Sequence, residues 1–438
     1  MPLLTFKGGI HPEEGKEISK HKAIIKYKPS GDIVLPVSQH IGAPATPVVN
    51  VGDRVLRGQL IASANGFVSA NIHSSVSGIV KAIEPRKTFT GAMVESIIIE
   101  NDQEYEEVPV TDFRKPEEMT AEEKIELIKN AGVVGMGGAC FPTHVKLSPK
   151  NPEKIEYVIV NGSECEPYLT SDYRRMVENP ELVIEGLRIM LSLFPNAKGI
   201  IAIEDNKHDV VYKFHKLLKK DPLISVKELY TKYPQGGERQ LIYALTKKKV
   251  NSSMLPADVG CIVDNVDTVV AIYDAVVNKK PLTNRIVTVT GDNVYSPYNY
   301  NVPIGTLYID LIQESGSFIN EPKKVISGGP MMGFAMEDCY VPIQKGSSAI
   351  LAMSKDDATC EETECINCGK CVSACPERLL PTLLAKAASN HETNKFVKLN
   401  GLECIECGCC TYVCPAKKNL AQTIKTKKKE VIASRRKK

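Results

Sequence analysis

The sequence predicts a multidomain chain of the α/β plus β class. Its 438 residues exceed what one ordinary hydrophobic core needs. Short runs rich in Val, Ile, Gly and Pro give way to alternating helix and strand patterns and then return, and two cysteine clusters follow. We therefore expect five segments along the chain, with boundaries at 1–110, 111–283, 284–355, 356–416 and 417–438.

Composition is that of a folded soluble protein, with 43% apolar and 24% charged residues. Met1 to Ile10 lacks the basic start and apolar core of a signal peptide, and no stretch approaches the length of a membrane span. We expect an intracellular protein with no nucleic-acid partner. Its 14 cysteines predict metal binding, because thiols in a reducing compartment seldom form disulfides.

The first segment reads as a small all-β domain. Between Ile33 and Glu100, short apolar runs alternate with turn signals. The spacing of VGDRVLRGQ from SSVSGIV resembles the lipoyl and biotinyl carrier barrels. The lysine that carries their swinging arm is missing from the hairpin tip, which favours a scaffold or docking role.

Helices and strands alternate from about Pro116 to Pro281. EEMTAEEKIELIKNAG and VVYKFHKLLKK have helical periodicity, whereas YVIVNG and KGIIAIEDN read as buried strands. From Arg285 the pattern returns to strands with Pro and Gly turns and one helix, ending near Met353. This last stretch predicts a second small β-rich domain.

Four polar loops in the α/β segment could hold a nucleotide. GVVGMGGACFPTHVKLS has four glycines that let backbone N–H groups approach a phosphate or flat ring, with Lys146 nearby; the alternative is a flexible surface loop. NGSECEPY ends a buried strand and presents Asn161, Glu164 and Glu166, which suit ribose or ribityl hydroxyls; the alternative is a solvated acidic turn. YPQGGERQ and IVDNVDT combine glycine, amide and acid similarly. The four loops predict one pocket if they converge.

The cysteine segment contains C-x2-C-x2-C-x3-C-P twice, the bacterial ferredoxin pattern in which each fourth cysteine binds the other cluster. One 4Fe-4S cluster is then assigned to Cys365, Cys368, Cys371 and Cys414, and the other to Cys404, Cys407, Cys410 and Cys375. A pair of zinc sites is the alternative, but zinc gives no reason for the third cysteine or the following proline. Cys409 and Cys360 fall outside the pattern and are interpreted as bystanders.

The last 22 residues hold ten Lys or Arg and one acid, Glu430. Such a run is typical of a solvated, partly disordered tail. The alternative is electrostatic attachment to anionic lipid or to an acidic partner.

These motifs carry a specific resemblance. GMGGACFPTHVKLS, VNGSECEPY, YPQGGE and VDNVDT are similar to the FMN- and NADH-binding loops of the flavin subunit of respiratory complex I. With the ferredoxin motifs and the opening FKGGIHPEEGKEI and LPVSQHIGAPATPVV, the chain resembles the RnfC component of the Rnf ferredoxin:NAD oxidoreductase complex, from Thr5 to about Pro415. The resemblance implies, in chain order, a barrel-sandwich domain, a Rossmann-like flavin domain, a β-grasp SLBB domain and a 2[4Fe-4S] ferredoxin domain.

The resemblance also implies ligands and roles. Glu166 is the catalytic candidate, near the nicotinamide ribose, and Phe141 is a candidate to stack on the dinucleotide. Non-covalent FMN would be held by Gly135, Gly137, Gly138, Lys146, Asn161, Glu164, Gly236, Glu238, Asp264 and Asn265.

The function implied is electron transfer between ferredoxin and NAD(H), because a flavin converts between hydride transfer and single-electron transfer. The expected partners are NAD(H), integral membrane subunits that pump sodium or protons, and, through them, ferredoxin. The expected location is peripheral, on the cytoplasmic side of the membrane. Two alternatives are an NADH-dependent cobalamin reductase, which the N-terminal segment disfavours, and a non-enzymatic electron-wiring subunit.

Overall fold

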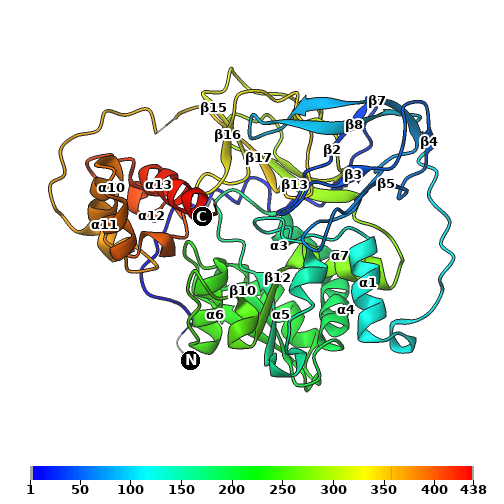
Figure 1. Cartoon of the computed structure of the whole chain (residues 1–438), viewed down its shortest axis with the longest axis horizontal. Helices are drawn as coiled ribbons and strands as arrows, with labels where there is room; N and C mark the ends of the chain where they lie inside the picture. The colour runs from blue at the N-terminus through cyan, green and yellow to red at the C-terminus, as the bar shows by residue number, and fades with distance from the viewer. Residues whose placement is uncertain (1–2, 357, 437–438) are drawn as a thin grey trace.

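A computed structural model describes residues 3–356 and 358–436 (Figure 1). The predictions for residues 1–2 of the first segment, residue 357 of the cysteine segment and residues 437–438 of the tail lie outside the described part. Within that part, none of the helices has the length and apolar character of a membrane span.

The first domain is built from two antiparallel sheets. Its four-stranded sheet has the order β2-β8-β7-β4 and its three-stranded sheet the order β3-β5-β6. Apolar side chains of both sheets, including Ile33, Leu35, Ile61 and Ile97, are fully buried between them. The strands are β2 (Ile33–Pro36), β3 (Thr46–Pro47), β4 (Arg54–Val55), β5 (Leu60–Ser63), β6 (Ile72–His73), β7 (Gly78–Lys87) and β8 (Met93–Asn101).

The α/β domain has a four-stranded parallel sheet in the order β11-β10-β9-β12. The strands are β9 (Tyr157–Gly162), β10 (Lys198–Glu204), β11 (Ile224–Leu229) and β12 (Cys261–Asn265). They are largely buried, because helices cover a parallel sheet. The helices are α1 (Ala121–Asn130), α2 (Thr143–Lys146), α3 (Ser171–Glu178), α4 (Pro180–Leu191), α5 (His208–Leu217), α6 (Glu238–Thr246) and α7 (Val266–Val276).

Local sequence fixes the ends of these elements. Helix α1 is capped by Thr120, whose side chain accepts from Glu123 N while the Glu123 carboxylate accepts from Thr120 N. Strands β9 and β12 are adjacent and parallel, so Asn161 pairs in register with Asn265. The strand ends therefore bring two of the predicted polar loops to one edge of the sheet.

A six-stranded sheet follows, in the order β1-β14-β13-β17-β15-β16. Its strands are β13 (Asn284–Thr290), β14 (Tyr298–Pro303), β15 (Lys324–Ser327), β16 (Phe334–Met336) and β17 (Ala349–Met353), with helix α8 (Tyr308–Glu314). The edge strand β1 (Ile25–Lys26) comes from the N-terminal segment and pairs with β14. The sequence did not predict that the N-terminal segment adds a strand to this sheet, because a two-residue strand is too short to show periodicity.

The cysteine domain is helical, with α9 (Lys370–Ala374), α10 (Pro381–Ser389), α11 (Thr393–Lys398) and α12 (Cys409–Tyr412). The basic tail forms α13 (Leu420–Arg436), which packs on α10 and buries Ile424 and Val431. The expectation of a partly disordered tail is therefore wrong for residues 420–436. Its apolar positions recur at helical spacing, a signal that the lysines obscure.

Candidate functional site

Three of the four polar loops meet around Lys146 at the end of α2. Its ammonium donates to the carbonyl of Val263 at 2.6 Å and to Asp264 Oδ1 at 3.1 Å. The Glu238 carboxylate lies 3.9 Å away, at the start of α6. The carboxylates of Asp264 and Glu238 raise the pKa of Lys146, although desolvation opposes them. Lys146 is therefore held as a cation among the loops.

The glycine loop lies against the end of β12. Gly135 N donates to the carbonyl of Phe141 at 2.9 Å, which closes the loop on itself. A Cβ at Gly137 would stand 2.8 Å from the Cβ of Asn265, so only glycine permits this approach. At Gly138 a Cβ would meet no heavy atom within 4 Å, which leaves its backbone open.

The fourth loop joins through Asn161. Its side-chain amide donates to the carbonyl of Gly236 at 2.9 Å, and Gly236 N donates to the Cys165 thiol at 3.3 Å. The convergence that a pocket requires is thus present in the structure.

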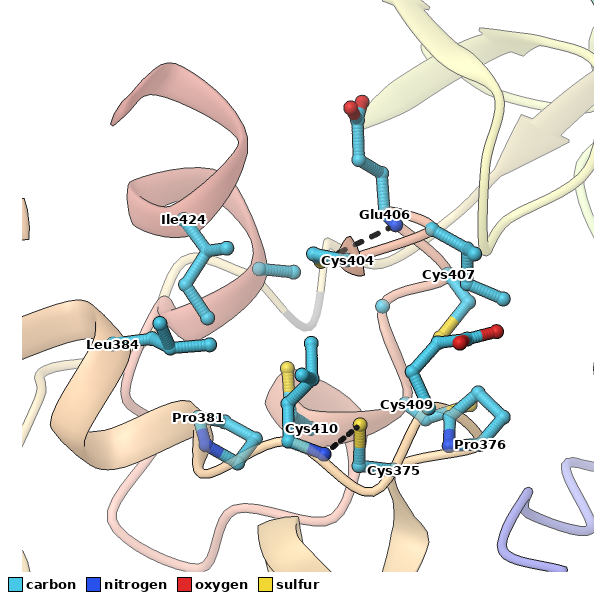
Figure 2. Close-up of a pocket in the computed structure, with 15 residues that line it drawn as sticks. Cys375, Pro376, Pro381, Leu384, Cys404, Glu406, Cys407, Cys409, Cys410 and Ile424 are labelled. Carbon is cyan, nitrogen blue, oxygen red and sulfur yellow. Dashed lines mark hydrogen bonds between the residues drawn. The ribbon is translucent and has the colours of Figure 1, made fainter. Parts of the chain in front are cut away.

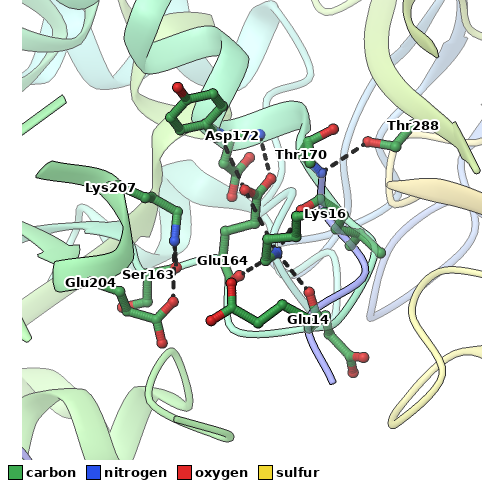
Figure 3. A network of polar contacts seen from close by, with 12 residues as sticks. Glu14, Lys16, Ser163, Glu164, Thr170, Asp172, Glu204, Lys207 and Thr288 are labelled. Atoms are coloured by element: carbon green, nitrogen blue, oxygen red, sulfur yellow. Dashed lines mark hydrogen bonds and ion pairs between the residues drawn. The ribbon is translucent and has the colours of Figure 1, made fainter. Parts of the chain in front are cut away.

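Glu164 faces inward instead of toward an open pocket (Figure 3). Its carboxylate accepts from the backbone N–H groups of Asp172 and Tyr173, at the start of α3, at 2.8 and 3.4 Å. The ammonium of Lys16 lies 3.9 Å away. Desolvation raises the pKa of Glu164, against the opposing effect of these partners. Glu164 therefore orders the loop around it as well as the helix start.

The carboxylate of Glu166 is hydrogen-bonded by backbone N–H groups of the domain that contains the six-stranded sheet. Its two carboxylate oxygens accept from Met331 N at 3.1 Å and Met332 N at 2.9 Å. Burial raises its pKa to about 7, although these N–H groups favour the anion. An ionised carboxylate has about four acceptor positions, so capacity remains for ligand hydroxyls.

Several buried polar atoms at the site have no hydrogen-bond partner among the described residues. They include Ser163 Oγ, Tyr233 OH, Gln235 Nε2 and Asp264 Oδ2. Buried polar groups are normally satisfied, and four orphans on the converging loops suit a polar ligand rich in hydroxyl and phosphate groups. The donor set fits a flavin mononucleotide.

Four predicted cluster ligands line one pocket, here called the inner site (Figure 2): Cys375, Cys404, Cys407 and Cys410. Leu384 and Ile424 complete its apolar wall. The Lys428 ammonium donates to the carbonyl of Cys404 at 2.6 Å. Cys409 lines the same pocket, so five thiols surround it, one more than the four that a 4Fe-4S cluster takes.

The other four predicted ligands, here called the outer site, are more open: Cys365, Cys368, Cys371 and Cys414. Cys365 and Cys368 are exposed, whereas Cys371 is buried and Cys414 partly buried. Across residues 3–356 and 358–436, no three His, Cys, Asp or Glu side chains are close enough to share a single metal ion.

The inner site adjoins the polar loops. Cys407 and Cys409 share a small hydrophobic cluster with Ile10, Tyr233 and Ala374, against which Cys165 and Met331 also pack. Cys409 is fully buried, with its thiol 4.0 Å from the carbonyl of Tyr233. Cys409 therefore packs at the domain contact, and its interpretation as a bystander in iron ligation stays a prediction.

Sequence reasoning missed residues that act from outside the motifs. Lys16 reaches the acidic loop from 148 residues away in the chain, and Met331 does so from 165. Lys207 is buried and bonds Ser163 O and Glu204. No local pattern marks a lysine that will be buried, so the sequence held no signal for these contacts.

Family models match four parts of the chain. They describe an RnfC barrel sandwich hybrid domain (residues 4–104), a Nuo51 FMN-binding domain (128–274), an SLBB domain (286–335) and a 4Fe-4S dicluster domain (364–418). These matches confirm the predicted fold classes and the two kinds of cofactor.

Two curated relatives are similar over most of their length. The C component of the Na(+)-translocating ferredoxin:NAD(+) oxidoreductase complex of Acetobacterium woodii is 43% identical, over 99% of this chain and 98% of the relative. The C component of the proton-translocating complex of Clostridium ljungdahlii is 44% identical, over 87% and 84%. Among solved structures, an NAD+-reducing [NiFe]-hydrogenase shares the fold, with a TM-score of 0.51 at 16% identity over 73% of this chain and 62% of its own.

Proposed function

Because the chain belongs to the RnfC family of ion-translocating ferredoxin:NAD(+) oxidoreductase complexes, we propose that it carries electrons between its 4Fe-4S clusters and NAD(H) through FMN. One observation carries the proposal. Two of the polar loops, through Cys165 and Tyr233, and the inner site, through Cys407, meet in one hydrophobic cluster. The proposed flavin site and the inner cluster site are thus in contact through this hydrophobic cluster.

FMN would lie among Gly135, Gly137, Gly138, Lys146, Asn161, Glu164, Gly236, Glu238, Asp264 and Asn265. Bound FMN supplies the conversion between hydride transfer and single-electron transfer. The space around Gly138 would let its backbone N–H approach a phosphate or ring edge, and Lys146 would supply positive charge. The nearby acids then act on hydroxyl groups, or hold Lys146, instead of facing a phosphate directly.

Glu166 is proposed as the residue that binds the nicotinamide ribose. Met331 N and Met332 N fix the carboxylate while leaving acceptor positions free. Phe141 is partly buried beside the glycine loop and remains the candidate to stack on the dinucleotide. Glu164 would act mainly by ordering the loop, since two backbone N–H groups of α3 already occupy its carboxylate.

The two cysteine sites would act in series. Exposed Cys365 and Cys368 place the outer cluster where another protein can reach it. Buried Cys407 places the inner cluster beside Tyr233, which begins one of the flavin loops. Electrons from a partner would enter at the outer site and leave by the inner one.

The partners are the other subunits of the complex, including integral membrane ones, and ferredoxin reaches this chain through them. The chain is a peripheral member of that membrane complex. We place it on the cytoplasmic side, where NAD(H) is available. The names of the relatives favour this activity over cobalamin reduction or passive electron wiring.

The test is an anaerobic titration of purified protein with NADH, followed by absorbance. The expected result is bleaching of both the flavin and the iron-sulfur bands. Lys146→Met should lose FMN, because it removes the charge at the centre of the loops, while Lys150→Met, an exposed neighbour, should keep it. Protein that retains no FMN, or whose flavin stays oxidised under NADH, would overturn the proposal.

A further inference from the structure

The first described residues form a strap, residues 4–20, that lies outside the sheets of the first domain. In Figure 1 the dark-blue chain runs between the orange and red helices of the ferredoxin domain and the green α/β domain. The strap has almost no regular structure of its own and makes backbone bonds to both neighbours instead. The strap therefore contacts both the ferredoxin domain and the α/β domain.

The strap touches the ferredoxin domain at an inner-site ligand. Gly9 N donates to the carbonyl of Ala374 at 2.9 Å. Gly8 has a φ of +84°, and a Cβ there would lie 2.7 Å from the carbonyl oxygen of Cys375. The backbone of the strap therefore packs directly against the backbone of Cys375. Only glycine at position 8 permits this approach, because any side chain there would clash.

Immediately beyond, the strap pairs with a flavin loop. Ile10 and Tyr233 exchange two backbone hydrogen bonds, at 2.8 and 2.9 Å. The ammonium of Lys232 donates to the carbonyls of Phe6 and Gly8 at 2.6 and 3.0 Å and lies 3.9 Å from the centre of the Phe6 ring. Lys232 is buried, so these bonds act in a low-dielectric setting that strengthens them.

The end of the strap orders the acidic loop (Figure 3). The buried Lys16 ammonium donates to the carbonyls of Glu164, Glu166 and Leu169 at 2.9, 2.9 and 2.6 Å. Tyr168 N donates to the carbonyl of Glu14 at 2.7 Å. One continuous segment of chain thus contacts an inner-site ligand and two of the flavin loops.

Direct contacts between the two domains comprise the small hydrophobic cluster around Tyr233 and Cys409 and several polar pairs. Arg239 donates to the Glu403 carboxylate at 2.9 Å, and Gln240 donates to Glu377 at 2.6 Å. Partly exposed pairs of this kind contribute little to stability. The strap adds a second link, because it makes backbone hydrogen bonds to both domains and buries Phe6, Ile10 and Lys16.

We propose that the strap is a positioning element that sets the separation of the inner cluster from the flavin. The proposal rests on the proposed function, since it assigns Cys375 to a cluster and the loops to FMN. Electron-transfer rates fall exponentially with distance, so a small shift of the ferredoxin domain alters the rate without touching either cofactor site. Gly8, Gly9 and Lys232 are the positioning residues.

The test compares Gly8→Ala with Gly52→Ala. Both glycines have a positive φ, +84° and +93°, so alanine brings similar backbone strain to each. Gly52 has no heavy atom within 4 Å of a Cβ, whereas Gly8 faces Cys375 O. The difference between the variants therefore isolates the contact from the strain.

We expect Gly8→Ala to keep FMN and iron at wild-type stoichiometry and to slow electron passage from flavin to iron by about tenfold or more in stopped-flow measurements. Hydrogen exchange should rise at residues 374–377, and the EPR spectrum of the inner cluster should change. Gly52→Ala should match the wild type in all three measurements. Equal rates and equal exchange in both variants would overturn the strap's role.

A second pair covers the case in which Gly8→Ala fails to fold. Lys232→Met removes the bonds to Phe6 O and Gly8 O without a steric clash, and Lys227→Met on β11 is its exposed control. A slower rate in Lys232→Met alone supports the strap, and equal rates overturn it. If wild-type protein passes no electrons from NADH to iron, the proposed function itself fails, which is a separate outcome.

Discussion

The inner and outer cysteine sites share one sequence motif but differ in exposure. Cys407 is buried among Tyr233, Ile10 and Cys409, whereas Cys365 and Cys368 are exposed. The described residues between Met353 and Lys370 contain no helix or strand. A motif therefore selects the ligands of a cluster, and packing against the rest of the chain decides what that cluster can reach.

The helix α13 contributes to this difference on one side only. Ile424 lines the inner pocket, and Lys428 bonds the carbonyl of Cys404. The lining residues also include Glu377 and Glu406. Matched substitutions at the inner and outer sites test this difference.

Removing a ligand from each site should give the largest effect. Cys407→Ala and Cys368→Ala should each lose about four irons, because each cluster depends on four thiolates. Only Cys407→Ala should also loosen the contact with Tyr233, since Cys407 belongs to the shared hydrophobic cluster. Iron analysis and hydrogen exchange at residues 232–236 would check both. Loosening by both variants alike would contradict the distinction.

The second-largest effect is expected from a substitution in the apolar wall of the inner pocket. Ile424→Ala should destabilise the ferredoxin domain by about 3 kcal/mol, because the side chain is 1% exposed beside the inner pocket. Ile432→Ala, on the same helix but 37% exposed, should cost less than about 1 kcal/mol. Thermal loss of the inner-cluster EPR signal measures the difference. Similar losses in the two variants would show that α13 does not support the pocket.

Glu166 should make stability depend on pH. Desolvation raises its pKa to about 7 from an ordinary 4.5, so the native state binds more protons than the unfolded state between these values. Stability should therefore fall as pH rises through this window, and Glu166→Gln should remove a change on the order of 1–3 kcal/mol. Unfolding at about pH 5 and about pH 8 measures it. A variant with the wild-type pH profile would contradict the burial of this carboxyl.

Removing a positive charge near the inner site should shift the reduction potential of the inner cluster and leave that of the outer cluster unchanged. Lys428→Gln removes a cation bonded to Cys404 O and should lower the inner-cluster reduction potential by on the order of tens of millivolts. Lys429→Gln removes the exposed neighbouring cation and should change it less. An EPR-monitored redox titration distinguishes the clusters. A larger shift at the outer cluster would reverse the assignment of ligands.

The smallest effect is expected at the surplus thiol. Cys409→Ala should leave the iron content unchanged, because the residue lies outside both ligand patterns. It should cost about 1 kcal/mol from lost packing, since Cys409 is fully buried at the contact with Tyr233. Iron analysis with thermal unfolding tests both statements. Loss of one cluster would show that Cys409 is a ligand.

The sequence predicted what local pattern encodes. Strand β9 and helix α1 follow from periodicity and capping, and the cysteine spacing identified the kind of cluster. It did not predict that the tail is a helix or that the strap joins two domains. Lys16 and Lys232 reach partners far along the chain, and such contacts depend on how domains pack. The ligand roles of all the predicted site residues, Glu164 and Phe141 among them, stay predictions.

The backbone hydrogen bonds to the Glu166 carboxylate have a consequence for how these domains can be recombined in evolution. Met331 donates its N–H to Glu166, while its carbonyl would lie 3.3 Å from a Cβ on Gly408, next to Cys407. The α/β module therefore cannot be excised or recombined alone without stripping a buried carboxyl of its donors. Gene fusions and transplants that preserve this chemistry must transfer the β-grasp unit as well.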